Sequence, residues 1–222
     1  DEIAVLGNAL DTGFSAIAAR DRERDQFLAV AAHELKTPIT SIHGFASVLA
    51  SHPGDRAVVD RAIDSIGRQS WRLSRLVEHL FLAMRLRSGE FQFEPKPFDY
   101  SALVLRSISE IKPFFPDQVF TCDVEHAVTM LGDDALLEHA IWSLFTCASA
   151  LSSGDKPLDV VLHATETNAR LTIDVQGANL AAHDIQALFV PFGSIEYENR
   201  SGIRAAVGLY LCRQIVQVHG GH

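Results

Sequence analysis

The stretch FLAVAAHELKTPITSIHGF, which runs from Phe27 to Phe45, sets one histidine and one glutamate side by side in an apolar, helix-favouring run. Apolar positions recur here at steps of three and four, the spacing of one face of an α-helix. They are Leu28, Ala31, Leu35, Pro38, Ile42, Phe45 and Leu49. His33 lies about 200° around the helix from both Ala31 and Leu35, at about 100° per residue, so its imidazole should face water.

Thr37 and Glu34 are expected to lie close to His33 on the helix. Thr37 follows it by four residues and therefore lies on the same helix face, while Glu34 is adjacent in sequence. Pro38 removes one backbone hydrogen bond and should bend the helix just beyond this cluster.

A second long helix is predicted after the turn SHPGD at residues 51–55. Its apolar seam again alternates steps of four and three, as in helix bundles. The seam consists of Val59, Ile63, Ile66, Ser70, Leu73, Val77, Leu80 and Met84. The two helices are expected to pack as an antiparallel hairpin. Because one hairpin buries little surface, we expect it to dimerise into a four-helix bundle.

The pattern changes after the linker RSGEFQFEPKPFDY, and a second domain is predicted from residue 98 to residue 222. The pattern predicts a helix over residues 100–111, a strand over 119–124 and a long helix over 133–151. A two-stranded hairpin around a polar turn at 166–169, a short helix in HDIQALFVPFG and a final helix over 207–218 follow. This order predicts an α+β domain with helices on one side of a mainly antiparallel sheet.

Composition narrows the classes of function. The net charge of -9, with 28 acidic and 19 basic residues, argues against nucleic acid as a partner. No apolar run is long enough to span a bilayer. The three cysteines have no metal-binding spacing and are expected to be inert thiols in or near the core, and no metal site is expected.

The residues of the opening stretch resemble the phosphoacceptor box of the sensor histidine kinases of two-component signalling, with the histidine, the following glutamate and the basic-Thr-Pro triplet in place. The resemblance implies a dimerisation and histidine-phosphotransfer domain over residues 25–90. The second domain resembles, in element order, a Bergerat-type ATP-binding sandwich, with LLEHAIWSLFTCASAL, DVQGANL, ALFVPFG and AAVGLYLCRQIVQVHGG at the positions of the four nucleotide boxes.

These boxes depart from the family pattern. Ser143 and Cys147 replace the two asparagines that hold Mg and the phosphates, and Ala150 replaces the lysine. Only Gly208 is kept in the second glycine box, where Ala205, Ala206 and Val207 stand in place of flexible glycines.

The first glycine box keeps Gly177 but has Val175 in the place of the adenine-binding aspartate and Asn179 in the place of the second glycine. Asp174 lies one residue away and, on a strand, would point to the opposite face unless a bulge re-aims it. The expected positions of this degenerate ATP site are therefore Ser143, Cys147, Asp174, Gly177, Asn179 and Gly208. Each lost charge-assisted contact is worth roughly 1.5 to 3 kcal/mol, so we expect no use of ATP or Mg as a cofactor.

The resemblance implies a function for the remaining cluster. His33 would accept a phosphoryl group as nucleophile, Glu34 would act as general base, and Thr37 would hold water for hydrolysis. The donor would be a response-regulator receiver domain or another histidine kinase, in a phosphorelay that runs through a pseudokinase homodimer. Two alternatives stay open: an active ATP-dependent autophosphorylating kinase with a divergent nucleotide pocket, and a non-catalytic module that regulates a partner kinase.

The resemblance also implies a place for the chain. Residues 1–24 resemble the end of a HAMP signalling helix, which implies the cytoplasmic portion of a receptor anchored in the inner membrane of a bacterium. The chain ends at His222, where the family continues with two more strands, so we expect C-terminal strands to be missing from this sequence.

Overall fold

The computed structural model describes residues 28–88, 91–152, 156–178, 180–189, 195–197, 200–203 and 208–222. The chain divides into two compact units, residues 1–76 and 77–222, and each is described by itself. The expected signalling helix over residues 1–24 lies outside the described residues. Within the ranges just given, no helix combines the length and the hydropathy that crossing a membrane requires.

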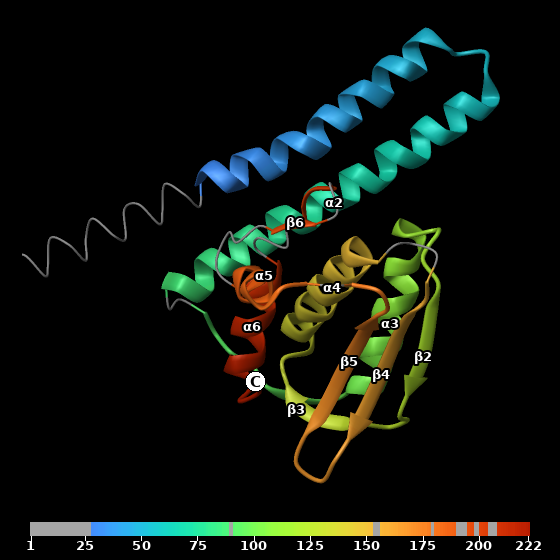
Figure 1. Cartoon of the computed structure of the whole chain (residues 1–222). Helices are drawn as coiled ribbons and strands as arrows, with labels where there is room; N and C mark the ends of the chain where they lie inside the picture. The colour runs from blue at the N-terminus through green and yellow to red at the C-terminus, as the bar shows by residue number, and fades with distance from the viewer. Residues whose placement is uncertain are drawn as a thin grey trace, which may run out of the picture. The chain divides into compact units, whose positions relative to one another are not determined.

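The first unit is a helical hairpin, as the sequence predicts (Figure 1). Residues 28–51 form its first helix, and α2 (Arg56–Ser88) begins in this unit and ends in the second. Asp55 starts α2 because its carboxylate accepts a hydrogen bond of 3.2 Å from the Val58 N–H, which would otherwise have no partner inside the helix. The predicted turn at residues 51–55 is therefore confirmed.

The apolar seam predicted for the first helix is confirmed apart from its first position. Ala31 and Pro38 are buried, and the seam continues through partly buried residues at Leu35, Ile42, Phe45 and Leu49. Leu28 is 56% exposed. A single continuous stripe therefore packs along this helix, and most residues between its members are exposed.

The seam predicted for α2 is wrong at three positions. Ile63 and Met84 are 54% and 52% exposed, and Ser70 is exposed as well. Ala62, one residue before Ile63, is only 1% exposed and lies on the buried face instead. A helix with 3.6 residues per turn drifts away from a strict 3.5-residue pattern, so the predicted seam leaves the face that packs in the hairpin.

The second unit holds the remaining helices and strands of the described chain. In chain order they are β1 (Lys96–Asp99), α3 (Tyr100–Ile111), the short 3-10 helix η1 (Lys112–Phe114), β2 (Phe120–Val124), β3 (Thr129–Gly132), α4 (Asp134–Leu151), β4 (Leu158–Ala164), β5 (Ala169–Val175), α5 (Ala182–Leu188), β6 (Ile195–Tyr197), β7 (Arg200–Ile203) and α6 (Gly208–Val218). The long predicted helices and the predicted two-stranded hairpin are confirmed. Strands β1, β3, β6 and β7 were not predicted.

The main sheet has the order β2-β4-β5 and is mixed, because β2 runs parallel to β4 whereas β4 runs antiparallel to β5. Strands β1 and β3 form a separate antiparallel pair, as do β6 and β7. The prediction of a mainly antiparallel sheet therefore holds for most of the described strand pairs. It is wrong for β2 and β4, which are parallel. A parallel neighbour for β4 requires a crossover connection, which α4 is long enough to supply.

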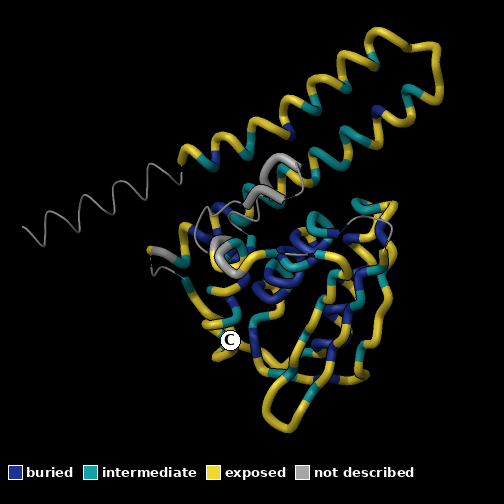
Figure 2. Tube along the Cα trace, in the orientation of Figure 1, coloured by how far each residue is buried: buried dark blue, intermediate teal, exposed yellow. Residues whose placement is uncertain are grey.

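Helices cover one face of the main sheet, as expected (Figure 1). Along β4 the buried residues Leu158, Val160 and Leu162 alternate with more exposed ones, which is the pattern of a strand with one face on the core. On α4, Phe145 is fully buried and its ring lies 5.8 Å from that of Phe120 on β2. Figure 2 shows the buried residues concentrated on α4 and on alternate strand positions.

His219, just after α6, joins the C-terminal end of that helix to the N-terminal end of α4. The Asp133 N–H donates a hydrogen bond of 2.9 Å to His219 Nε2, and Nδ1 lies 2.8 Å from the Ile215 carbonyl. Nε2 must therefore be the unprotonated nitrogen and Nδ1 the one that donates. The imidazole packs so closely on Gly132 that a Cβ there would lie 2.8 Å from His219 Cδ2.

We predict that Gly132→Ala lowers the free energy of unfolding by roughly 1 to 3 kcal/mol, because its methyl group would displace the His219 ring or Phe98. The matched control is Gly67→Ala on α2, where a Cβ would meet nothing within 4 Å. That change should stabilise the helix by about 0.5 to 1 kcal/mol. Urea denaturation followed by tryptophan fluorescence measures both, and equal midpoints for the two variants would contradict the described packing of His219.

Candidate phosphoacceptor and degenerate nucleotide sites

The first candidate site lies on the helix over residues 28–51. The His33 side chain is 58% exposed, which confirms the expectation that its imidazole faces water, whereas the Glu34 side chain is only 14% exposed. The difference follows from helix geometry, because neighbouring residues are about 100° apart and Glu34 is turned toward the buried seam. A solvent-facing imidazole and a shielded carboxylate therefore sit side by side.

The geometry of this pair distinguishes the two ring nitrogens. Nδ1 of His33 lies 3.8 Å from Oε1 of Glu34, within reach of an ion pair but longer than a hydrogen bond. A small side-chain rotation would bring the carboxylate into hydrogen-bond range of Nδ1. Nδ1 is thus the nitrogen on the Glu34 side, and Nε2 is the nitrogen on the far side of the ring from it.

Thr37 lies one turn beyond His33 and is exposed. Its hydroxyl donates a long hydrogen bond of 3.4 Å to the His33 carbonyl, so the side chain is held weakly and can turn toward another partner. The helix continues through Pro38 to residue 51, although Pro38 has no N–H to donate to the Glu34 carbonyl. His33, Glu34 and Thr37 are thus brought together on one stretch of helix.

The positions predicted for the nucleotide site fall on α4, on the end of β5 and on α6. Ser143 is 4% exposed, and its hydroxyl donates to the His139 carbonyl at 2.8 Å, within its own helix. Gly208 begins α6, and a Cβ there would lie 3.2 Å from Ser143 Oγ. The structure therefore brings Ser143 and Gly208 together by close helix packing.

Cys147 lies one turn further along α4 and is 7% exposed. Burial raises the pKa of its thiol to about 11, so the sulfur is protonated at neutral pH. A buried neutral thiol is a poor substitute for a side-chain oxygen, because Mg²⁺ prefers oxygen ligands in octahedral geometry.

Asp174 lies on the face of β5 that is turned away from the helices. Along β5 the residues alternate between partly buried and exposed, with Asp174 exposed and Val175 partly buried. The β4–β5 register runs without interruption from Leu158 opposite Val175 to Ala164 opposite Ala169, so no bulge re-aims the carboxylate. The orientation expected from the one-residue offset is therefore the orientation found.

Gly177 follows β5 in a turn and has a φ of +85°, a backbone conformation that glycine adopts without strain. Lys156 Nζ lies 3.1 Å from the point where a Cβ of Gly177 would stand. The sequence pattern does not single out this lysine, because Ala150 occupies the lysine position of the family box. Lys156 precedes β4, and only strand pairing brings it beside the end of β5. Asn179, Phe192 and residues 205–207 lie outside the described residues.

The described side chains at these positions do not fit Mg and ATP. The Ser143 hydroxyl is buried and bonded to its own helix, and the Cys147 thiol is protonated, so neither supplies a metal ligand. The Asp174 carboxylate faces outward and cannot accept a hydrogen bond from adenine. Across the same described residues, no group of three or more histidine, cysteine, aspartate or glutamate side chains could hold a metal ion. We derive no chemical step through the nucleotide at this site.

The expectation that all three thiols lie in or near the core is wrong for one of them. Cys122 on β2 is exposed, whereas Cys147 and Cys212 are buried. Burial raises the pKa of the Cys212 thiol to about 12. It also raises the pKa of the Cys122 thiol, opposed by the nearby Lys112 ammonium, which favours the thiolate. Burial on α4 and α6 keeps two thiols protonated, whereas the third lies exposed on β2, an edge strand of the main sheet.

We predict that a disulfide reagent such as Ellman's reagent labels one thiol quickly in the folded protein at pH 8. Cys122→Ser should abolish that fast phase, because the buried thiols of Cys147 and Cys212 are protonated and inaccessible. Denaturant should expose all three thiols. Fast labelling of two or more thiols without denaturant would contradict the burial of Cys147 or of Cys212.

Two protein-family models match the chain. The His Kinase A (phospho-acceptor) domain matches residues 23–89, and the histidine kinase-, DNA gyrase B- and HSP90-like ATPase matches residues 132–222. Together the two matches cover most of the sequence, and they occur in the order that the hairpin and the α+β unit follow. The chain belongs to the sensor histidine kinase family.

Curated relatives agree with this membership. The probable sensor histidine kinase TcrY of Mycobacterium tuberculosis is 28% identical over 99% of this chain and 48% of its own length. The heme sensor protein HssS of Staphylococcus aureus is 24% identical over 100% of this chain and 48% of its own length. The chain therefore spans about half the length of the curated relatives it matches.

Solved structures share the fold. The histidine kinase AdeS of Acinetobacter baumannii matches with a TM-score of 0.56 and 22% identity, over 83% of this chain and 86% of that one. The histidine kinase ThkA, in a complex with the response regulator protein TrrA, matches with a TM-score of 0.54 and 20% identity, over 87% of this chain and 55% of that one. At these identities the likeness concerns the fold alone.

Proposed function

We propose that this chain exchanges phosphoryl groups between His33 and the aspartate of a response-regulator receiver domain, and that its second domain does not use ATP. One contrast carries the proposal. The His33 ring is 58% exposed beside a shielded carboxylate, whereas Ser143, Cys147 and Asp174 do not fit Mg and ATP.

The proposed step uses the two nitrogens of His33 differently. Neutral imidazole with its proton on Nδ1 attacks the phosphorus of the regulator's aspartyl phosphate through the Nε2 lone pair. The bond between phosphorus and the carboxylate oxygen breaks as the P–N bond forms, and the regulator leaves with a free carboxylate. The Nδ1 proton then passes toward Glu34, which must first close the 3.8 Å separation. Reversal of the same step would phosphorylate the regulator.

Thr37 is proposed to act in hydrolysis rather than in transfer. Its hydroxyl is exposed on the His33 face and bonded only weakly to a backbone carbonyl. Turned outward, it can hold a water molecule in line with the aspartyl phosphate of a docked regulator. Any Mg in this reaction would belong to the regulator.

We further propose the assembly and location that the family resemblance implies. Residues 25–90 would form a homodimeric four-helix bundle, residues 98–222 would form the degenerate ATPase-like domain, and the chain would be the cytoplasmic portion of an inner-membrane-anchored receptor. Support for the bundle comes from Ile39 and Ile63, large apolar side chains on the hairpin that are 52% and 54% exposed.

A second candidate is an active ATP-dependent kinase with a divergent pocket. The observation that favours it is the match of relatives named sensor histidine kinases along the full length of the chain. Lys156 beside Gly177 adds a cation close to one retained glycine. A third candidate, a module that regulates a partner kinase without chemistry, would not need His33.

We predict that the purified chain shows no heat of ATP binding in the presence of Mg by isothermal titration, and that radiolabelled ATP transfers no label. Labelled receiver domain should in contrast pass its phosphoryl group to the wild-type chain but not to His33→Ala. Label from ATP that depends on His33 would establish the active kinase and overturn the pseudokinase assignment. Identical regulator dephosphorylation by wild type and His33→Ala would favour the module without chemistry.

Thr37 and Thr40 offer a matched pair of variants. Both hydroxyls donate to the carbonyl four residues earlier, to His33 at 3.4 Å and to Lys36 at 2.9 Å, so loss of the helix contact is similar. We predict that Thr37→Ala slows dephosphorylation of the receiver domain by at least ten-fold but leaves phosphoryl acceptance by His33 within two-fold. Thr40→Ala should change neither rate, and equal losses in both variants would show that only the helix was affected.

A further inference from the structure

The ring of His219, the residue that follows α6, is held at both of its nitrogens. Nδ1 lies 2.8 Å from the Ile215 carbonyl, one turn earlier on α6, and Nε2 accepts the hydrogen bond of 2.9 Å from the Asp133 N–H at the start of α4. The backbone N–H of His219 bonds to the Ile215 and Val216 carbonyls as well, at 3.2 and 3.1 Å. The end of α6 therefore fixes the direction in which Nε2 points.

Two further segments pack against this ring. The ring of Phe93 lies 4.9 Å from the His219 ring, between centroids, at an angle of 85°. On β3, a Cβ at Gly132 would stand 2.8 Å from Cδ2 and 3.1 Å from Nε2 of His219. Figure 1 shows the C-terminal end of the chain beside β3. We call these contacts of the His219 ring with α4, α6, β3 and Phe93 the His219 junction.

The junction also holds the segment that connects α2 with β1. We call residues 91–95 of this segment the strap. At its start the Arg85 guanidinium, near the end of α2, lies over the Phe91 ring at 6.0 Å from the ring centroid. Two residues later, Phe93 contacts His219. The strap is thus attached to α2 at one end and to the His219 junction at the other, and all of these residues belong to the second unit.

A proton added to the His219 ring changes the contact at Nε2 alone. Nδ1 already donates to the Ile215 carbonyl in the neutral ring, so that contact is the same in the imidazolium. Nε2 would become a second N–H and would face the Asp133 N–H at 2.9 Å, where two donors repel each other. The Asp133 N–H would lose its acceptor, and a partly buried backbone donor without a partner is costly.

The charged groups around the junction do not compensate a charge on the ring. The Asp133 carboxylate accepts from the Leu136 N–H at 3.1 Å, and Glu94 of the strap pairs with Lys96 of β1 at 3.3 Å. Within the part of the chain that the structure describes, no carboxylate lies within ion-pair distance of His219. The carbonyl end of α6 favours a positive charge at Nδ1, whereas the amide end of α4 opposes one at Nε2.

The other titratable residues in the adjoining parts of these elements are of two kinds. Some are exposed and solvated, namely Asp99, Asp134, Arg213 and His222. Tyr100 and Cys212 are buried, and because burial raises their pKa values both are neutral. Strand β3 carries no titratable side chain. Within these described elements, His219 is thus the group whose charge changes near neutral pH.

We propose that the His219 junction is an acid-sensitive switch, in which a proton taken up at Nε2 breaks the hydrogen bond from Asp133 and releases the strap and the start of α4 from α6. The closed junction requires the neutral ring, so it is formed at high pH. It opens as the pH falls through the range in which imidazole titrates in water, about pH 6.5. The ring is partly exposed, so water can deliver the proton. His33 takes no part in the junction, and the switch is independent of phosphoryl exchange.

The test is hydrogen exchange of the whole chain, followed by NMR and divided by the intrinsic exchange rate at each pH. The Asp133 amide reports on the junction directly. We expect its protection to fall at least five-fold between pH 7.5 and pH 5.0, and one proton linked to opening limits the change to about thirty-fold. The Tyr100 amide, which donates to the Val128 carbonyl at 2.7 Å, should change less than two-fold. Chymotrypsin cleavage after Phe91 and Phe93, relative to a free peptide of residues 88–98, should rise over the same pH range.

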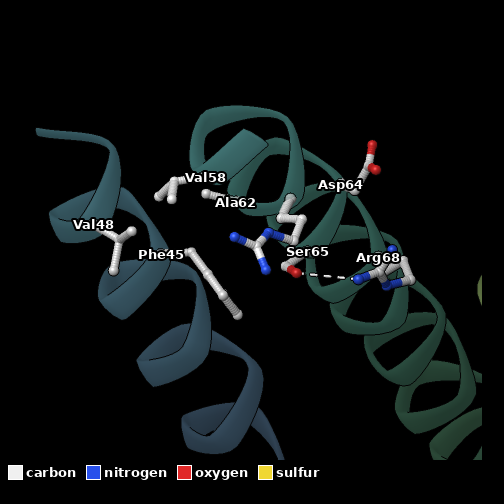
Figure 3. Close-up of a pocket in the computed structure, with 8 residues that line it drawn as sticks. Phe45, Val48, Val58, Ala62, Asp64, Ser65 and Arg68 are labelled. Carbon is white, nitrogen blue, oxygen red and sulfur yellow. Dashed lines mark hydrogen bonds between the residues drawn. The ribbon is translucent and has the colours of Figure 1, made fainter. Parts of the chain in front are cut away.

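The hairpin supplies a reference region without a titrating histidine. Figure 3 shows the groove between its two helices near the turn, and none of the eight residues that line it is a histidine. Ala62 belongs to this lining and is only 1% exposed. Its amide should keep its protection between pH 7.5 and pH 5.0. An equal loss at Ala62 and at Asp133 would indicate general acid unfolding and would overturn the switch.

Two variants assign the effect to one histidine. His219→Gln keeps an oxygen acceptor for the Asp133 N–H but does not titrate, so we expect the Asp133 amide and the strap to be protected equally at both pH values. His163→Gln is the matched control, because His163 pairs with Glu125 at 2.9 Å on β4, and it should show the pH dependence of the wild type.

A measurement on the wild type alone keeps the test decisive if His219→Gln does not fold. The NMR titration of the His219 ring should have the same midpoint as the loss of Asp133 protection. Protection of Asp133 that does not change with pH, or a midpoint that differs from that of the ring, would overturn the switch. So would an equal loss of protection in folded His219→Gln, or a pH dependence that His163→Gln removes.

Discussion

Helix α6 lies directly on α4 at Gly208, where an added side chain would crowd Ser143. A Cβ at that position would stand 3.2 Å from the Ser143 hydroxyl, and the other end of the contact is held by the hydrogen bond from Asp133 to His219. Helix α4 also carries Trp142, Phe145 and Ile141, which are almost completely buried. Trp142 lies against Phe114 of η1 and Phe145 against Phe120 of β2, so α4 contributes a large part of the core of the second unit.

The contact between α4 and α6 also involves two positions of the expected nucleotide site. In the family, the positions of Ser143 and Gly208 belong to boxes that hold Mg and phosphate, and here they hold two helices together. Ser143 satisfies its hydroxyl on its own helix, and Cys147 is a protonated, buried thiol. Ser143 and Cys147 serve the packing of α4, whereas the His33 side chain is 58% exposed. This contrast is the basis of the proposed function.

The hairpin shows how one helix can serve three purposes at once. Helix α2 packs Ala62 against its partner helix, presents Ile63 on an apolar face, and carries arginines on a third face. These faces are compatible because successive residues rotate by about 100°. Burial supplies stability on the first face, and apolar exposure on the second leaves surface for another subunit. On the third face, Arg61 and Arg72 are exposed to water.

Features that depend on local periodicity were determined by the sequence alone. The two long helices, α3, α4, the β4–β5 hairpin, the exposure of His33 and the outward direction of Asp174 all follow from the spacing of apolar residues or from strand alternation. Strands β1 and β3 were missed because β1 contains Pro97 and its pairing partner lies more than thirty residues away. The tertiary structure alone decided which face of α2 is buried, that Lys156 lies beside Gly177, and that Cys122 is exposed. Each of these depends on contacts between segments distant in sequence, where small rotations of a helix or the order of strands in a sheet change the neighbours without changing the local pattern.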